Sequence, residues 1–168
     1  MPILTTDMKV FKTVNGLGGA ITGDESVSGV SGNVFDVFSG AETAAGGVFY
    51  ACVYLKNNHG SLTAQNITAW IDSESAHAGV NASFAIGQSA VNGVESTIVN
   101  ENTAPAGVTF SDTDTTTTGE TVADASFAIA DIPFGQHQAL WLRLTIDAAT
   151  AAKTGYQINT KFQFDTAE

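Results

Sequence analysis

The sequence is poor in basic residues and in charged residues of any kind. Lys and Arg together number 6 against 17 Asp and Glu, which gives a formal net charge of -11. Such a surface repels a phosphate backbone and an anionic bilayer, so we expect neither nucleic acid nor a membrane as a partner. Charged residues make up 14% of the chain, whereas the hydrophobic content is 43%. This balance excludes the disordered class, which combines low hydrophobicity with high charge.

Cysteine pairs, long apolar runs and a targeting signal are also missing. Cys52 is the only cysteine, so no disulfide can form within the chain. It stands in the apolar run Val48–Leu55, where the sequence predicts a small buried hydrophobe rather than a reactive thiol. No stretch reaches the roughly 18 apolar residues of a membrane-spanning helix. The first residues contain neither the basic nor the apolar region of a signal peptide, so we expect synthesis in a reducing cytoplasm.

The sequence contains none of the common motifs of catalysis or nucleotide binding. No Ser, Thr or Cys stands in a nucleophile motif such as GxSxG. The glycine cluster Gly16–Gly19 lacks the Lys and the Ser or Thr of a phosphate-binding loop, which favours a flexible segment. His59, His77 and His137 stand apart in predicted turns, without the close spacing of metal ligands. We therefore predict no catalytic residue, no cofactor and no metal site.

A calcium site is a weaker hypothesis for the threonine-rich tract 111–120. Asp112, Asp114 and Glu120 offer carboxylate oxygens there. A calcium loop needs a third acid or amide and a glycine at its sixth position, whereas this tract has threonine at the third ligand position and Gly119 too late. A solvated acidic loop is the favoured interpretation.

A carbohydrate site would need exposed aromatic side chains, and the chain has two tryptophans, Trp70 and Trp141. Trp141 faces away from the leucines beside it, so it would be partly exposed on one sheet face. The favoured alternative is that both tryptophans pack under a loop or against the N-terminal segment. Arg143, two residues after Trp141, is expected to pair with a carboxylate or to stack on an aromatic ring.

What the sequence does contain is period-two alternation. It is strongest at residues 139–146, where Leu140, Leu142, Leu144 and Ile146 share one face, and at residues 155–164. With shorter candidates there are about eight predicted strands, at residues 9–14, 34–38, 48–56, the second half of 62–71, 82–86, 97–99, 139–146 and 155–164. Turn signals recur about every ten residues and no convincing helix stands between them. The sequence predicts an all-β, antiparallel β-sandwich, immunoglobulin-like or jelly-roll, with a small barrel as a further alternative.

The first 32 residues differ from the remainder in their density of glycine. We predict an N-terminal glycine-rich arm at residues 1–32 and a β-sandwich domain at residues 33–168. Such an arm would become ordered on docking to a neighbouring protein. Its apolar side chains are the predicted partner-binding residues: Met8, Val10, Phe11 and Val14.

Several segments resemble small virion structural proteins encoded by tailed phages and prophages. These segments are Val34–Glu42, Tyr50–His59, Leu62–Ile71, Thr103–Phe110 and Ile132–Arg143. The resemblance spans roughly residues 34–146 and involves strands and turns of the scaffold rather than chemical motifs. It implies an immunoglobulin-like sandwich that is located in the virion after assembly in the host cytoplasm. It also implies the major capsid protein or other virion proteins as partners, and it supplies no catalytic residue.

Our first hypothesis is a non-enzymatic capsid decoration (cement) protein that binds the outer shell, forms a homo-oligomer and stabilises the particle. Two alternatives stay open. One is a tail, neck or head-fibre component of the virion, and the other is a carbohydrate-binding adhesion module. An enzyme would require histidines to converge with carboxylates, which no spacing in the sequence suggests.

Overall fold

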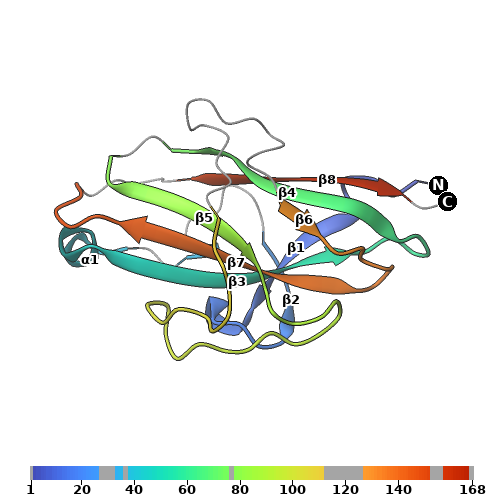
Figure 1. Ribbon diagram of the computed structural model, residues 1–168, viewed down its shortest axis with the longest axis horizontal. Coiled ribbons are helices and arrows are strands. Elements are labelled where there is room, and N and C mark those ends of the chain that lie inside the picture. Colours follow the sequence, from blue (N-terminus) through green and yellow to red (C-terminus); the bar gives the residue numbers. More distant parts are fainter. Residues whose placement is uncertain are drawn as a thin grey trace.

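The computed structural model describes residues 2–26, 33–35, 38–75, 78–111, 127–151 and 157–166. Within these residues two antiparallel sheets pack face to face (Figure 1). The five-stranded sheet has the order β2-β1-β3-β7-β5, from Ile21–Glu25, Met8–Thr13, Gly47–Asn57, His137–Ile146 and Val80–Ile86. The three-stranded sheet has the order β6-β4-β8, from Phe127–Ile129, Ala64–Glu74 and Ile158–Thr166. The predicted all-β, antiparallel sandwich of about eight strands is confirmed.

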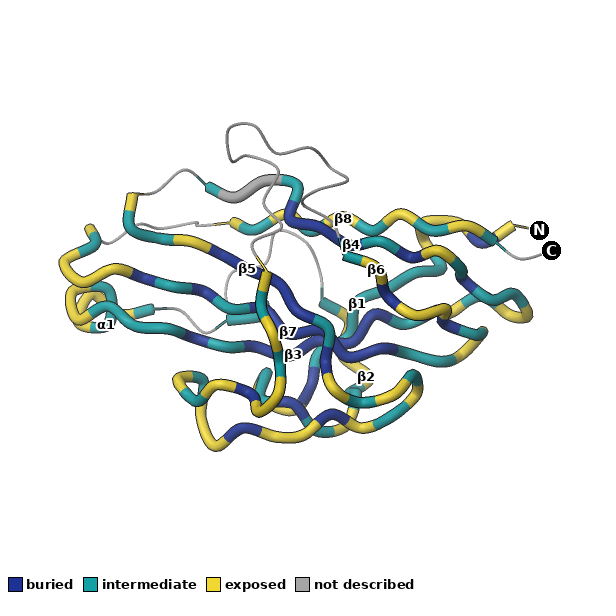
Figure 2. The backbone as a smooth tube through the Cα atoms, viewed as in Figure 1, coloured by how far each residue is buried: buried dark blue, intermediate teal, exposed yellow. Residues whose placement is uncertain are grey.

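The main core lies between the two sheets. Every second residue of β7 faces this core, and the leucines occupy these positions. Leu140, Leu142 and Leu144 of β7 are buried in this core. They share it with Leu55 of β3 and Ile67 of β4, which are fully buried. Burial of one such side chain stabilises a fold by about 1.5–3 kcal/mol. Figure 2 shows the resulting band of buried positions along the middle of the facing strands.

The structure corrects the prediction that the N-terminal segment is an arm that becomes ordered on docking. β1 pairs antiparallel with β3, from Met8 opposite Asn57 to Lys12 opposite Val53, and β2 pairs with β1. Side chains alternate between two faces along residues 8–13, and one face of β1 packs on the main core. This packing orders the segment within the chain itself. The strands β1 and β2 therefore belong to the sandwich. The predicted domain boundary at residue 32 lies outside the described residues.

A short α-helix lies between the predicted strands 34–38 and 48–56, where the sequence indicated no helix. Helix α1 spans Gly40–Ala45 and begins with a capping box. The Ser39 hydroxyl accepts a hydrogen bond from the Glu42 N–H at 3.2 Å, and the Glu42 carboxylate accepts one from the Ser39 N–H at 2.7 Å. This reciprocal pair satisfies two backbone donors that a helix start otherwise leaves free.

Two predicted strands do not form ladders in the described residues. Val34 and Phe35 lie in a bend, and residues 36–37 lie outside the description. Residues 97–99 belong to a long irregular segment after β5. The last strand, predicted from residue 155, begins at Ile158, and residues 152–156 lie outside the description.

Candidate interaction surface

The five-stranded sheet is buried on its outer face as well as on its inner one. Trp141, Tyr54 and Cys52 project away from the main core and form a second cluster with Ile98. Two segments pack over this face, residues 14–19 after β1 and residues 88–111 after β5, and together we call them the outer cover. In Figure 1 they form the loops that protrude beneath β3 and β7. Irregular segments longer than roughly 12–15 residues are uncommon in compact domains and are usually functional or disordered.

Hydrogen bonds from Tyr54 tie the two segments of the outer cover to the sheet. The Tyr54 hydroxyl donates to the Gly19 carbonyl at 2.6 Å and accepts from the Glu95 N–H at 2.8 Å. The Gly19 N–H in turn donates to the Glu95 carbonyl at 3.0 Å, and the Ile98 N–H donates to the Leu17 carbonyl at 2.9 Å. Burial raises the pKa of Tyr54, so its hydroxyl stays protonated and able to donate.

The glycines of the 16–19 cluster permit this close approach. Gly18 has a φ of +85°, and a Cβ there would lie 2.3 Å from the Ser96 carbonyl oxygen. A side chain cannot occupy that space, and L-residues rarely adopt that backbone conformation. The prediction that Gly16–Gly19 is a flexible segment is therefore wrong, because these glycines form a packed contact.

Exposed apolar side chains are concentrated on the outer cover. Of the five large hydrophobic residues that are exposed in the described part of the chain, three lie on it: Val14 (60%), Val94 (67%) and Val99 (87%). A hollow of about 200 Å³ adjoins Val99 and is also lined by Ile98 and Pro105. Contiguous apolar patches are typical of sites of protein–protein contact, and these valines are the exposed apolar side chains that the outer cover offers to a partner.

The structure does not bring the four predicted partner-binding residues together on one surface. Met8 and Val10 pack against the main core. Phe11 is half-buried, with the Lys56 ammonium 5.3 Å from its ring centroid. Val14 alone is exposed on the outer cover. Sequence reasoning missed Val94 and Val99 as surface residues, because neither stands in a motif.

Both tryptophans are buried, so neither offers the exposed ring that a carbohydrate site requires. The packing of Trp141 under a loop is confirmed, because it lies in the cluster beneath the outer cover. Its partial exposure was the wrong alternative, since residues 88–111 cover that face. Arg143 stacks as expected, with its guanidinium carbon 5.0 Å from the Phe110 ring centroid, and its Nε donates to the Ser83 hydroxyl at 2.8 Å.

The remaining candidate groups have structural surroundings. Cys52 is buried, as predicted, and desolvation raises the pKa of its thiol. His59 Nδ1 accepts from the N–H groups of Ser61 and Leu62 within a turn. The His137 ring lies edge-on to Tyr54 at 4.7 Å, and desolvation lowers its pKa. Outside the described residues lie His77, Asp112, Asp114 and Glu120.

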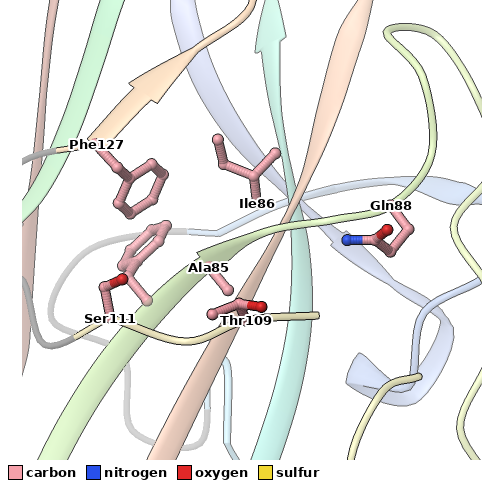
Figure 3. Close-up of a pocket in the computed structure, with 7 residues that line it drawn as sticks. Ala85, Ile86, Gln88, Thr109, Ser111 and Phe127 are labelled. Carbon is pink, nitrogen blue, oxygen red and sulfur yellow. The ribbon is translucent and has the colours of Figure 1, made fainter. Parts of the chain in front are cut away.

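A second hollow, also of about 200 Å³, lies at the edge of β5. Its lining is neutral, with Phe127 of β6 on one side and Thr109 and Ser111 on the other (Figure 3). Phe84 and Ser111 exchange two backbone hydrogen bonds of 3.1 and 3.0 Å, so the segment before residue 112 pairs locally with β5. This lining provides neither a general base nor a charged group for anchoring a ligand.

Two further results apply to the part of the chain that the structure describes. In it, no three His, Cys, Asp or Glu side chains gather as a group able to hold a metal ion. No helix there has the length and apolar character needed to cross a membrane.

Comparisons with protein-family models, with curated proteins and with solved structures found no match to this chain.

Proposed function

We propose that this chain is a non-enzymatic structural protein of a virion and acts as a capsid decoration protein. The setting comes from the resemblance of its strands and turns to small virion proteins of tailed phages. The observation that carries the proposal is the outer cover, which is hydrogen-bonded to the sheet and displays three exposed valines. A passive binding role needs such a surface and needs no catalytic group.

In this account the outer cover docks on the major capsid protein. Val14, Val94 and Val99 lose their contact with water in the interface, and the apolar area they bury contributes to binding. A ligand that binds only the assembled shell stabilises that shell by mass action. The prior attachment of residues 14–19 and 88–111 to Tyr54 keeps the ordering cost of binding low.

Substitution of the exposed valines tests this surface. We expect Val14→Asp combined with Val99→Asp to weaken binding of the purified protein to particles prepared without it by at least about tenfold, because two carboxylates would be desolvated in the interface. Leu4→Asp combined with Phe134→Asp is the matched control, since Leu4 (52%) and Phe134 (55%) are similarly exposed but lie outside the outer cover. Equal binding by both variants in a particle co-sedimentation assay would exclude the outer cover as the docking surface.

A tail, neck or head-fibre component is the second candidate, because the same surface would serve a partner in those positions. The two candidates differ in stoichiometry. A shell protein repeats with the capsid lattice, whereas a tail or neck protein is present in few copies.

A further inference from the structure

Strand β8 is a regular strand at the end of its sheet. Among the described residues it pairs only with β4, so its other edge has no described partner strand. The two irregularities in the β4–β8 ladder are extra residues on β4, between Gln65 and Thr68 and between Ile71 and Ser73. Strand β8 itself runs from Ile158 to Thr166 without a bulge. Proteins commonly protect an edge strand with a bulge, a proline, short length or charged side chains. Strand β8 has none of the first three, and its charges, Lys161 and Asp165, are of opposite sign.

The sequence of β8 is symmetric about Gln163. Residues 160–166 read Thr-Lys-Phe-Gln-Phe-Asp-Thr. Threonine stands three positions to either side of Gln163, and phenylalanine stands one position to either side. The two sides differ only at the second position from Gln163, which is Lys161 on one side and Asp165 on the other. These two residues carry opposite charges. A strand with this symmetry is complementary to an antiparallel copy of itself.

We propose that β8 pairs with β8 of a second copy of this chain, about a two-fold axis that passes through Gln163. In this register Lys161 lies opposite the partner's Asp165, and Phe162 lies opposite the partner's Phe164. Aromatic pairs and opposite charges directly across two antiparallel strands are stabilising, and the two-fold axis produces each pair twice. The three-stranded sheets of the two copies would then form one continuous six-stranded sheet.

Other registers lose these pairs. An axis at Phe162 would place Lys161 opposite Gln163, and an axis at Phe164 would place Phe162 opposite Thr166. A shift by a single residue would bring the outward side chains of one strand to the inner face of the other, because the side-chain period of a strand is two. The axis at Gln163 alone matches charge, aromatic and hydroxyl positions together.

The neighbouring side chains accommodate the second copy. Lys161 Nζ lies 2.7 Å from Asp72 Oδ1, and its side chain is 57% exposed. Asp165 Oδ2 accepts from the Asn66 side-chain amide at 3.1 Å. An ammonium has three donors and a carboxylate has two acceptor oxygens, so both groups keep capacity for a partner's charge. On the inner side, Phe162 and Phe164 pack against the core but are only half-buried.

The first test is the mass of the isolated protein in solution, measured by analytical ultracentrifugation from about 1 to 100 μM. We expect a dimer whose dissociation constant rises at least tenfold in Lys161→Asp, because that carboxylate would face the partner's Asp165. Lys9→Asp is the matched control, since it removes the same charge and the Lys9–Glu25 ion pair of 2.7 Å on the other sheet. It should leave the dimer unchanged. A monomeric wild type, or equal effects of both variants, would overturn the proposal.

Cysteine cross-linking tests the register and does not depend on Lys161. Gln163→Cys places two thiols across the axis, at the Cα separation of about 5 Å found for opposed strand residues. Asn159→Cys, also exposed on β8, would lie about 26 Å from its copy, eight residues away along the strands. Copper-catalysed air oxidation should give covalent dimers of the first variant only, while buried Cys52 stays unreactive. Equal cross-linking of the two variants would exclude this register. Neither test depends on the proposed virion function.

Discussion

Tyr54 is the residue on which the outer cover depends most directly. Its hydroxyl bonds both segments of the cover, at the Gly19 carbonyl and at the Glu95 N–H. Tyr54→Phe would leave both of these backbone groups without that partner under the cover, so we expect a loss of about 1–3 kcal/mol in the free energy of unfolding. Urea denaturation measures this loss. Tyr50→Phe on the same strand is the control and should stay within about 0.5 kcal/mol; an equally small effect at Tyr54 would contradict the role assigned to its hydroxyl.

His137 predicts a pH dependence of stability. Desolvation lowers its pKa below the ordinary value of 6.5; a backbone hydrogen bond at Gly93 opposes this shift, and the smaller effect of the Lys56 charge adds to it. As the pH falls through 6.5, the unfolded chain takes up the proton before the folded chain does. The free energy of unfolding therefore decreases on acidification and levels off below the folded pKa.

This pH effect is measured by urea denaturation at intervals between about pH 8 and pH 5. His137→Gln should remove the part of the slope that lies just below pH 6.5. An unchanged slope in His137→Gln would show that other groups cause it.

At the residue scale, sequence reasoning predicts roles that depend on local pattern. The burial of Cys52 follows from its apolar run. The stacking of Arg143 was one of two expected alternatives, and its ring partner, Phe110, is distant in the chain. The role of Tyr54 does not follow in this way. Its two partners are 35 and 41 residues distant in the chain, so only the tertiary structure reveals them.

At the scale of elements, residues 16–19 pack closely against residues 95–98. We expect Gly18→Ala to destabilise the protein by more than about 2 kcal/mol, because its left-handed backbone alone costs about 1–2 kcal/mol and the Cβ would overlap the Ser96 carbonyl. Thermal denaturation provides the measurement. Gly23→Ala in β2 is the control, since nothing lies within 4 Å of a Cβ placed there. If the two variants melt at the same temperature, the packing of this contact is not as described.

The elements that sequence predicted well are a strand with strict alternation and a strand within a continuous apolar run. Residues 139–146 and 48–56 became the centre of the five-stranded sheet as β7 and β3. Helix α1 was missed although its start has a readable signal, Ser39 followed three residues later by Glu42. The helix has only six residues and lies among glycines, so its apolar pattern is too short to indicate a helix.

At the scale of the whole molecule, alternation and turn spacing predict the sandwich but not its strand order. The order β2-β1-β3-β7-β5 includes neighbours that are far apart in the chain, and a single sequence does not specify such pairs. The same limit applies to the interaction surface. Val14, Val94 and Val99 share the outer cover because Tyr54 and direct backbone hydrogen bonds hold two distant segments together.

The central claim, that the chain is a repeated component of a viral shell, has one direct measurement. It is the copy number of this chain per purified particle, relative to the major capsid protein, by quantitative mass spectrometry. A decoration protein that follows the capsid lattice predicts a ratio near one or a simple fraction of it. A handful of copies would contradict the decoration role and favour the tail or neck. Absence from purified particles would contradict the virion function altogether.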